Sequence, residues 1–409
     1  MTRFTKIAAG VLGAIALASC GGGGGGDSVS PTQPAGIAQL VTFGDSLSDV
    51  GTYKVGSIAA VGGGQFTVNS ATSKNWTELI SSRLGLAAPC AAQTGFSPLI
   101  PGFTGAATVN NTACRNYAQG SARVTNPYGP NSKAVQDFVF NANGGASGGA
   151  AAVTAAANAS PLGFTALPVV NQINNHLAAV GGSFSDRDLV LVLAGGNDVF
   201  LNLGGVGPAA AGGAGAGAAA FLAGWTPDQQ RAVAAGGTAA VSAAQTAAVQ
   251  GMTRAGEELA GYVKTLIVAK GAKFVTVVNL PDVAQTPLVA GFDAATRGFV
   301  NQLSTTFNGA LQAGLANTPG VVIVDAYAQG RAQVASPAAF GLTNVTGRAC
   351  STTSTANPLA GASITCTTAS TIAEDTSRYN FSDDVHLTPY GNQLLADFVL
   401  GRIVAAGVR

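Results

Sequence analysis

Charged side chains are scarce in this 409-residue sequence. Asp, Glu, Lys and Arg together make up 10% of the residues, against about 25% in an ordinary soluble domain. The 20 basic and 19 acidic residues leave a formal net charge of +1, and no basic block is longer than a residue or two. Nucleic-acid binding depends on clustered Lys and Arg that meet the phosphates. The sequence therefore predicts no nucleic-acid partner.

Histidine is scarcer still, since His176 and His386 are the only two in the chain. The five cysteines include no pair at the short spacing typical of zinc sites. The sequence thus predicts neither a metal nor a cofactor. Internal repeats of 20–50 residues, which would indicate a solenoid or propeller, are absent as well. Apolar residues make up 47% of the chain, enough to bury the core of one large α/β domain.

The N-terminus is typical of an exported protein. Arg3 and Lys6 precede an apolar stretch, 7–18, that is too short to span a bilayer comfortably. It ends in Leu-Ala-Ser-Cys20, which resembles the lipobox of bacterial lipoproteins, where the peptide is cut before the cysteine and Cys20 is acylated. A plain signal peptide that contains a cysteine is the alternative. We expect a signal peptide at 1–19 and a lipidated Cys20 with a Gly-rich linker at 20–36. The protein would then be an outer-membrane-anchored lipoprotein, or periplasmic or extracellular.

The four other cysteines agree with an oxidising compartment, where disulfides persist. We predict the pairs Cys90–Cys114 and Cys350–Cys366, each of which closes a short loop rich in Thr, Ala, Gly and Asn. Four cysteines allow three pairings, so the pattern alone leaves the other two open.

Strands and helices are predicted to alternate along the chain. The run 188–194 is continuously apolar, as in a strand covered on both faces. Such alternation indicates a parallel sheet with helices on both faces, and ligands bind beyond the carboxyl ends of its strands. The Ala/Gly-rich segments 144–159 and 204–224 are expected to be surface insertions without assigned structure. The predicted strands are 39–43, 188–194, 273–279 and 321–325. The predicted helices are 75–84, 165–180, 239–269, 296–315 and 389–404, the last with Thr388 as its cap and Pro389 at its first position.

Two residues far apart in the chain suggest nucleophilic catalysis. Ser46 follows the first strand in the sequence Gly-Asp-Ser, and a serine hydroxyl is a weak nucleophile until a base accepts its proton. His386 is three residues after Asp383, a spacing that lets the carboxylate hold one ring nitrogen and leaves the other for the serine. Asp384 is the rival carboxylate, whose side chain should turn away. His176 is expected to be an ordinary surface or half-buried helix residue.

Four blocks of sequence together resemble the GDSL (SGNH-hydrolase) family of serine esterases. They occur in the family's order, at 43–49, 116–123, 195–198 and 383–386. The resemblance implies a flavodoxin-like three-layer α/β/α sandwich with a mostly parallel sheet, over 37–409, like the larger lipase-type members. It implies Ser46 as nucleophile, His386 as general base and Asp383 as its orienting carboxylate. The oxyanion hole would consist of the Ser46 and Gly120 N–H groups and the Asn197 amide, although a turn glycine and a capping asparagine are the alternatives for the last two.

The predicted function is hydrolysis of carboxylic esters through an acyl-enzyme, without a cofactor. The expected partners are a small-molecule or lipid ester as substrate and a membrane, reached through the N-terminal lipid anchor. A carbohydrate deacetylase, a thioesterase or a phospholipase on the same scaffold is the first alternative. A catalytically inactive surface lipoprotein that binds ligands is the second.

Overall fold

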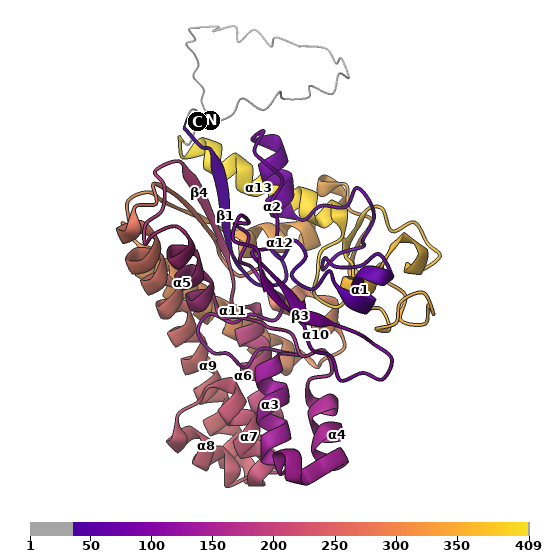
Figure 1. The fold of residues 1–409 in the computed structure, drawn as a ribbon. Coiled ribbons are helices and arrows are strands. Elements are labelled where there is room, and N and C mark those ends of the chain that lie inside the picture. The colour runs from indigo at the N-terminus through magenta and orange to yellow at the C-terminus, as the bar shows by residue number, and fades with distance from the viewer. Residues whose placement is uncertain (1–35, 408–409) are drawn as a thin grey trace, which may run out of the picture. The chain divides into compact units, whose positions relative to one another are not determined.

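The computed structural model describes residues 36–407, and its centre is a four-stranded parallel sheet (Figure 1). Each strand pairs in parallel with the next one in chain order. The carboxyl ends of all four strands therefore meet at one edge of the sheet, as the sequence predicted. The strands, in spatial order, are β1 (Gln39–Gly44), β4 (Asp188–Leu193), β5 (Phe274–Val278) and β6 (Val321–Val324).

The side chains of β4 alternate between the two faces of the sheet. Val190 and Val192 join one buried cluster, which they share with α5 (Val169–Ala179), α9 (Gly237–Tyr262) and α11 (Ala294–Leu315). The leucines at 189, 191 and 193 join the other cluster, together with α2 (Trp76–Arg83) and α13 (Pro389–Ala405). Helices thus cover both faces, and the predicted three-layer α/β/α architecture is confirmed.

The remaining elements lie outside the central sheet. Two small sheets lie outside the central one: β2 (Gln93–Phe96) pairs antiparallel with β3 (Ala106–Asn110), and β7 (Asn344–Arg348) pairs in parallel with β8 (Tyr379–Phe381). The other helices are α1 (Gly56–Ala60), α3 (Lys133–Ala142), α4 (Gly149–Ala159), α6 (Gly196–Val206), α7 (Gly213–Ala223), α8 (Pro227–Ala234), α10 (Pro287–Ala290) and α12 (Ala326–Ala335). Of these, α3, α4, α7 and α8 are grouped together (Figure 1).

The two Ala/Gly-rich segments, to which the sequence assigned no structure, are largely helical. Most of 144–159 belongs to α4, and 204–224 contains the end of α6 and all of α7. Ala152 on α4 and Ala220 on α7 are fully buried. Phe138 on α3 and Phe221 on α7 stack with ring centroids 4.8 Å apart. Alanine is the best helix former, and packing against neighbouring helices stabilises these low-complexity segments as helices.

Local signals at helix starts and the cysteine spacing were informative. The Thr388 side chain caps α13 by accepting the Gly391 N–H, as predicted. Both predicted disulfides, Cys90–Cys114 and Cys350–Cys366, are present.

Within residues 36–407, no helix is both long and apolar enough to cross a membrane. The predicted signal peptide and Cys20 lie outside the described residues.

Candidate active site

Ser46 lies on the turn that leaves the carboxyl end of β1. Its Oγ is 2.8 Å from Nε2 of His386, although the two residues are 340 positions apart. Gly44, two residues earlier, lies so close to the end of β4 that a Cβ there would be 2.1 Å from the Leu193 carbonyl oxygen. The buried Gln172 amide holds this glycine through both its N–H, at 2.9 Å, and its carbonyl, at 2.8 Å. The turn that presents Ser46 is therefore fixed by a residue of α5 that sequence reasoning did not identify.

His386 is held by the carboxylate that the spacing predicted. Nδ1 of His386 is 2.8 Å from each carboxylate oxygen of Asp383. The backbone N–H groups of Val385 and His386 also donate to Asp383 Oδ1, at 3.0 and 2.9 Å. Asp384 turns away instead, into an ion pair with Arg348. The structure thus brings Ser46, His386 and Asp383 into one hydrogen-bonded chain and leaves Asp384 out of it.

Electrostatics favour an ionised Asp383. Burial alone would raise the pKa of this carboxyl. The positive charge of a protonated His386, together with hydrogen bonds from His386, Ser363 and the Val385 amide, outweighs burial and holds the Asp383 pKa well below its usual range. An ionised carboxylate accepts hydrogen bonds only, so the proton on His386 Nδ1 is directed to Asp383. Nε2 is then the nitrogen that can accept the proton of Ser46.

Asn197 contacts the same site from the first turn of α6. It lines one pocket with Ser46 and His386, and its amide donates to the Ala122 carbonyl oxygen at 2.8 Å. An amide group has two hydrogens, and the second has no partner among the described residues. The backbone N–H of Ser46 is likewise unpaired within 36–407. Both groups are therefore free to donate to a further acceptor in the pocket.

The Gly120 amide, expected as the third donor, is already occupied. It donates to Oδ2 of Asp49 at 2.9 Å, so the proposed role of the Gly120 N–H needs correction. The reason is the buried Asp49 carboxylate of the first block, whose Oδ1 also accepts from Gly51 and Thr52, at 2.8 Å each. Asp49 therefore ties the first block to the second. Its pKa is raised by burial even though these hydrogen bonds act in the opposite direction.

Ser121, the residue after Gly120, has the more available amide. Its φ of 70° lies in the left-handed region, which a residue with a side chain rarely adopts. The side chain is buried, at 9% exposure, and no described residue accepts a hydrogen bond from its N–H. A strained backbone with an unpaired amide, next to the segment that Asn197 contacts, is the better candidate for the third donor. Only the tertiary structure shows that the two adjacent amides differ.

A family comparison agrees with this geometry. The model of the GDSL-like lipase/acylhydrolase family matches residues 40–399. The chain belongs to this family. It is thus a hydrolase, and its fold is the one that the family resemblance implied. The comparison with curated proteins found no match to the chain.

A buried ion pair joins two of the family blocks. Nε of Arg123 lies 2.9 Å from Oδ1 of Asp198, and both side chains are 4% exposed. The other oxygen of Asp198 accepts the Val124 N–H at 3.1 Å, while the guanidinium also donates to the carbonyl oxygens of residues 222 and 223 in α7. Both residues belong to the family blocks at 116–123 and 195–198, but the sequence predicted no role for either. In this hydrolase they connect the second block to the helix that carries Asn197.

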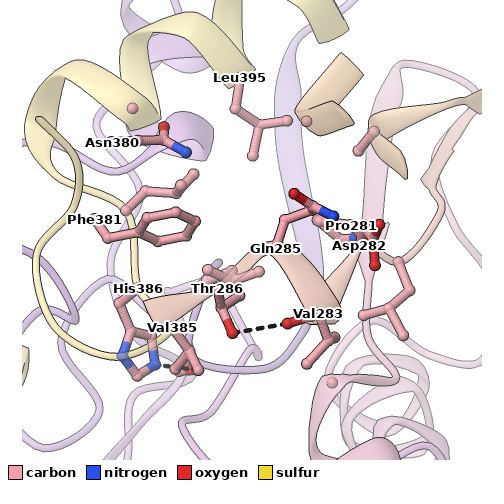
Figure 2. Close-up of a pocket in the computed structure, with 18 of the residues that line it drawn as sticks. Pro281, Asp282, Val283, Gln285, Thr286, Asn380, Phe381, Val385, His386 and Leu395 are labelled. Carbon is pink, nitrogen blue, oxygen red and sulfur yellow. Dashed lines mark hydrogen bonds between the residues drawn. The ribbon is translucent and has the colours of Figure 1, made fainter. Parts of the chain in front are cut away.

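The pocket beside Ser46 has a largely apolar wall and a volume of about 110 Å³. Figure 2 shows His386, Val385 and Phe381 along one side of it, Leu395 at the top and Val283 on the opposite side. Leu280, on the loop after β5, completes the wall, and the Asn308 side chain of α11 holds that residue through both its N–H and its carbonyl, at 2.8 Å each. Helix and loop residues thus build a cavity suited to a hydrocarbon group.

His176 lies away from this site and is more buried than expected. It is 1% exposed, not a surface or half-buried residue. Its ring packs among Phe184, Tyr117 and Phe43, with centroids 4.5, 5.3 and 5.7 Å away. Neither ring nitrogen has a hydrogen-bond partner among the described residues. Burial, assisted by the charge of Arg115, lowers the His176 pKa to about 4, which makes this imidazole a neutral core residue.

Proposed function

We propose that this hydrolase is a serine esterase that cleaves carboxylic esters through an acyl-enzyme. The observation that carries the proposal is the chain of hydrogen bonds from Ser46 through His386 to Asp383, with Ser46 and His386 lining a largely apolar pocket. In the proposed mechanism, Ser46 Oγ attacks the ester carbonyl while His386 Nε2 takes the hydroxyl proton. Asp383 keeps the proton on Nδ1 and stabilises the imidazolium that forms.

The remaining steps return the enzyme to its starting state. The tetrahedral oxyanion receives hydrogen bonds from the Ser46 N–H and the Asn197 amide, with the Ser121 N–H as the third donor. His386 then gives its proton to the leaving alkoxide, and the C–O bond to the alcohol breaks. Water attacks the acyl-enzyme with His386 again as base, and the carboxylic acid leaves as Ser46 recovers its proton.

The wall of the pocket supports an acyl chain as the group it holds. Each methylene that enters contributes about 0.8 kcal/mol, or about fourfold in kcat/KM. We therefore expect kcat/KM on p-nitrophenyl esters to rise from acetate through the next several chain lengths and then to level off when the pocket is filled. Preference for acetylated xylan or for a thioester would favour the deacetylase or the thioesterase, and preference for a phospholipid would favour the phospholipase.

Replacement of the nucleophile tests the activity itself. Ser46→Ala should abolish hydrolysis of every ester in the series, because the triad acts as a unit. A fluorophosphonate probe should label the wild-type protein at Ser46 and leave the variant unlabelled. A wild-type protein that neither reacts with the probe nor hydrolyses any ester would favour the inactive binding lipoprotein.

We also propose that the protein is exported and anchored through an acylated Cys20. The lipobox-like sequence and the two disulfides support this proposal. Cys20→Ser should abolish palmitate incorporation and move the protein from the membrane fraction to the soluble fraction, because stable anchoring requires more than one acyl chain. Equal labelling of the variant would refute the anchor.

A further inference from the structure

The loop that the Cys350–Cys366 disulfide closes reaches the active site at one residue, Ser363. This serine is 1% exposed and begins a short 3-10 turn, Ser363–Thr365. Its backbone N–H donates to Oδ2 of Asp383 at 2.9 Å. Its Oγ is 3.2 Å from Nδ1 of His386. One residue from a distant loop therefore contacts both the carboxylate and the imidazole.

The direction of the Oγ contact follows from the proton on Nδ1. Because the Asp383 carboxylate can only accept, Nδ1 of His386 carries the hydrogen. The Ser363 hydroxyl oxygen is then a second acceptor for that hydrogen, beside the carboxylate. An acceptor at this place stabilises the imidazolium more than the neutral ring. Ser363 would thus assist the protonated form of His386, which the proposed mechanism needs at each tetrahedral intermediate.

The loop is fixed from both sides. Cys350 and Cys366 are both buried and joined by the disulfide. The side-chain amide of Asn69 donates to the carbonyl oxygens of Ser363 and Cys366, at 2.9 Å each. Phe66, three residues before Asn69, lies against the His386 ring with centroids 4.9 Å apart. The segment that holds the loop therefore also packs on the imidazole.

We propose that Ser363 is a positioning residue for the Asp383–His386 pair, and that the Cys350–Cys366 loop holds it in place. This inference rests on the proposed function, since Ser363 acts only through the Asp383–His386 pair. The loop is not needed to form the triad contacts, because Asp383 and His386 lie on one turn. It supplies the extra donor and acceptor that fix their rotation.

Other charged groups near His386 must be kept constant in a test. Asp45, buried beside the nucleophile, interacts electrostatically with His386. Asp384 lies on the same turn and is paired with Arg348. A substitution at Ser363 leaves all of these in place, so a difference from the wild type reports on Ser363.

The first experiment compares two buried hydroxyls in the same stretch of chain. Ser363→Ala should lower kcat about threefold to tenfold and leave KM unchanged, since loss of the acceptor destabilises protonated His386 more than the neutral ring. The acidic limb of its kcat–pH profile should move to lower pH by a few tenths of a unit. Ser370→Ala is the matched control, because Ser370 is fully buried and, among the described residues, its hydroxyl bonds only to the backbone of Thr367. Identical kcat values and pH profiles for the two variants would overturn the inference.

The second experiment releases the loop and uses the other disulfide as control. C350A/C366A should lower kcat further than Ser363→Ala, measured at a temperature where the variant is folded, whereas C90A/C114A should keep the wild-type pH profile. Equal loss of kcat in the two double variants would contradict the inference. Ser46→Ala in the same assay separates the two proposals. Turnover by Ser46→Ala would refute the proposed function. If Ser46→Ala is inactive and Ser363→Ala has the wild-type kcat and pH profile, only the role of Ser363 is refuted.

Discussion

At the scale of single residues, neighbouring groups with similar sequence signals have different environments. Gly120 and Ser121 are adjacent, but the amide of the first is bound by Asp49 and that of the second is unpaired among the described residues. Asp383 and Asp384 are adjacent as well, yet one faces His386 and the other Arg348. Substitutions at single positions therefore test the roles assigned here most directly.

Asn197→Ala tests the oxyanion donor. Loss of a donor that acts only in the transition state should lower kcat by about 10²–10³ and leave KM near its wild-type value. Ala122 would also lose the donor to its carbonyl oxygen, so thermal melting must be measured beside the kinetics. A variant that melts early but has normal kcat in its folded fraction would indicate a purely structural asparagine.

The pH dependence of stability tests the burial of His176. Its pKa is about 4 when folded, against 6.5 for an ordinary histidine, so below pH 6.5 the unfolded chain binds the proton and the folded chain does not. The contribution of His176 to the free energy of unfolding is therefore fully present above pH 6.5 and is lost as the pH falls toward 4. His176→Phe should remove this loss, as measured by urea unfolding at several pH values.

The stability of the wild type must be compared with that of His176→Phe, because Asp45 also titrates in this pH range. Burial raises the Asp45 pKa from 3.8 to about 7. The contribution of Asp45 to the free energy of unfolding is therefore fully present below pH 3.8 and is lost as the pH rises toward 7. The two trends oppose each other in the wild type. The difference between wild type and His176→Phe cancels the Asp45 trend. A difference that does not change between pH 4 and 6.5 would contradict the buried, neutral imidazole.

At the scale of elements, the Arg123–Asp198 pair connects α6 and α7 to the second block. Asp198→Ala would leave the Arg123 guanidinium buried without its carboxylate, and the Val124 N–H would lose its acceptor. Breaking a buried pair in this way typically costs about 3–5 kcal/mol. Chemical denaturation should show a loss of this size. Asp228→Ala is the control, because its ion pair with Arg231 is exposed and should contribute less than about 1 kcal/mol.

At the scale of the whole molecule, the Cys90–Cys114 disulfide should matter for stability more than for chemistry. The two cysteines are 24 positions apart, in the part of the chain between β1 and the second block. C90A/C114A should lower the free energy of unfolding by about 3 kcal/mol, because the unfolded chain gains conformational freedom. Unfolding curves in oxidising buffer measure this loss. An unchanged midpoint would show that the cross-link does not limit the unfolded state.

The sequence by itself determined the features that depend on short-range patterns. The continuous run 188–194 predicted a doubly covered strand, Thr388 and Pro389 predicted the start of α13, and the Asp383–His386 spacing predicted which carboxylate faces the imidazole. These features are local, since propensity, capping and a turn of three residues decide them. The family blocks then predicted that Ser46 and His386 meet.

Only the tertiary structure decided which hydrogen-bonding groups of the site already have a partner and which are free to bind another group. No local pattern shows that Asp49 binds the Gly120 amide, that Ser363 reaches His386, or that His176 lies among aromatic rings. The Ala/Gly-rich segments became helices because neighbouring helices bury one of their faces, and the sequence offers no periodic apolar stripe that would reveal it. In each case the deciding contact joins residues distant in the chain, and burial and hydrogen bonding at such contacts are properties of the packed molecule.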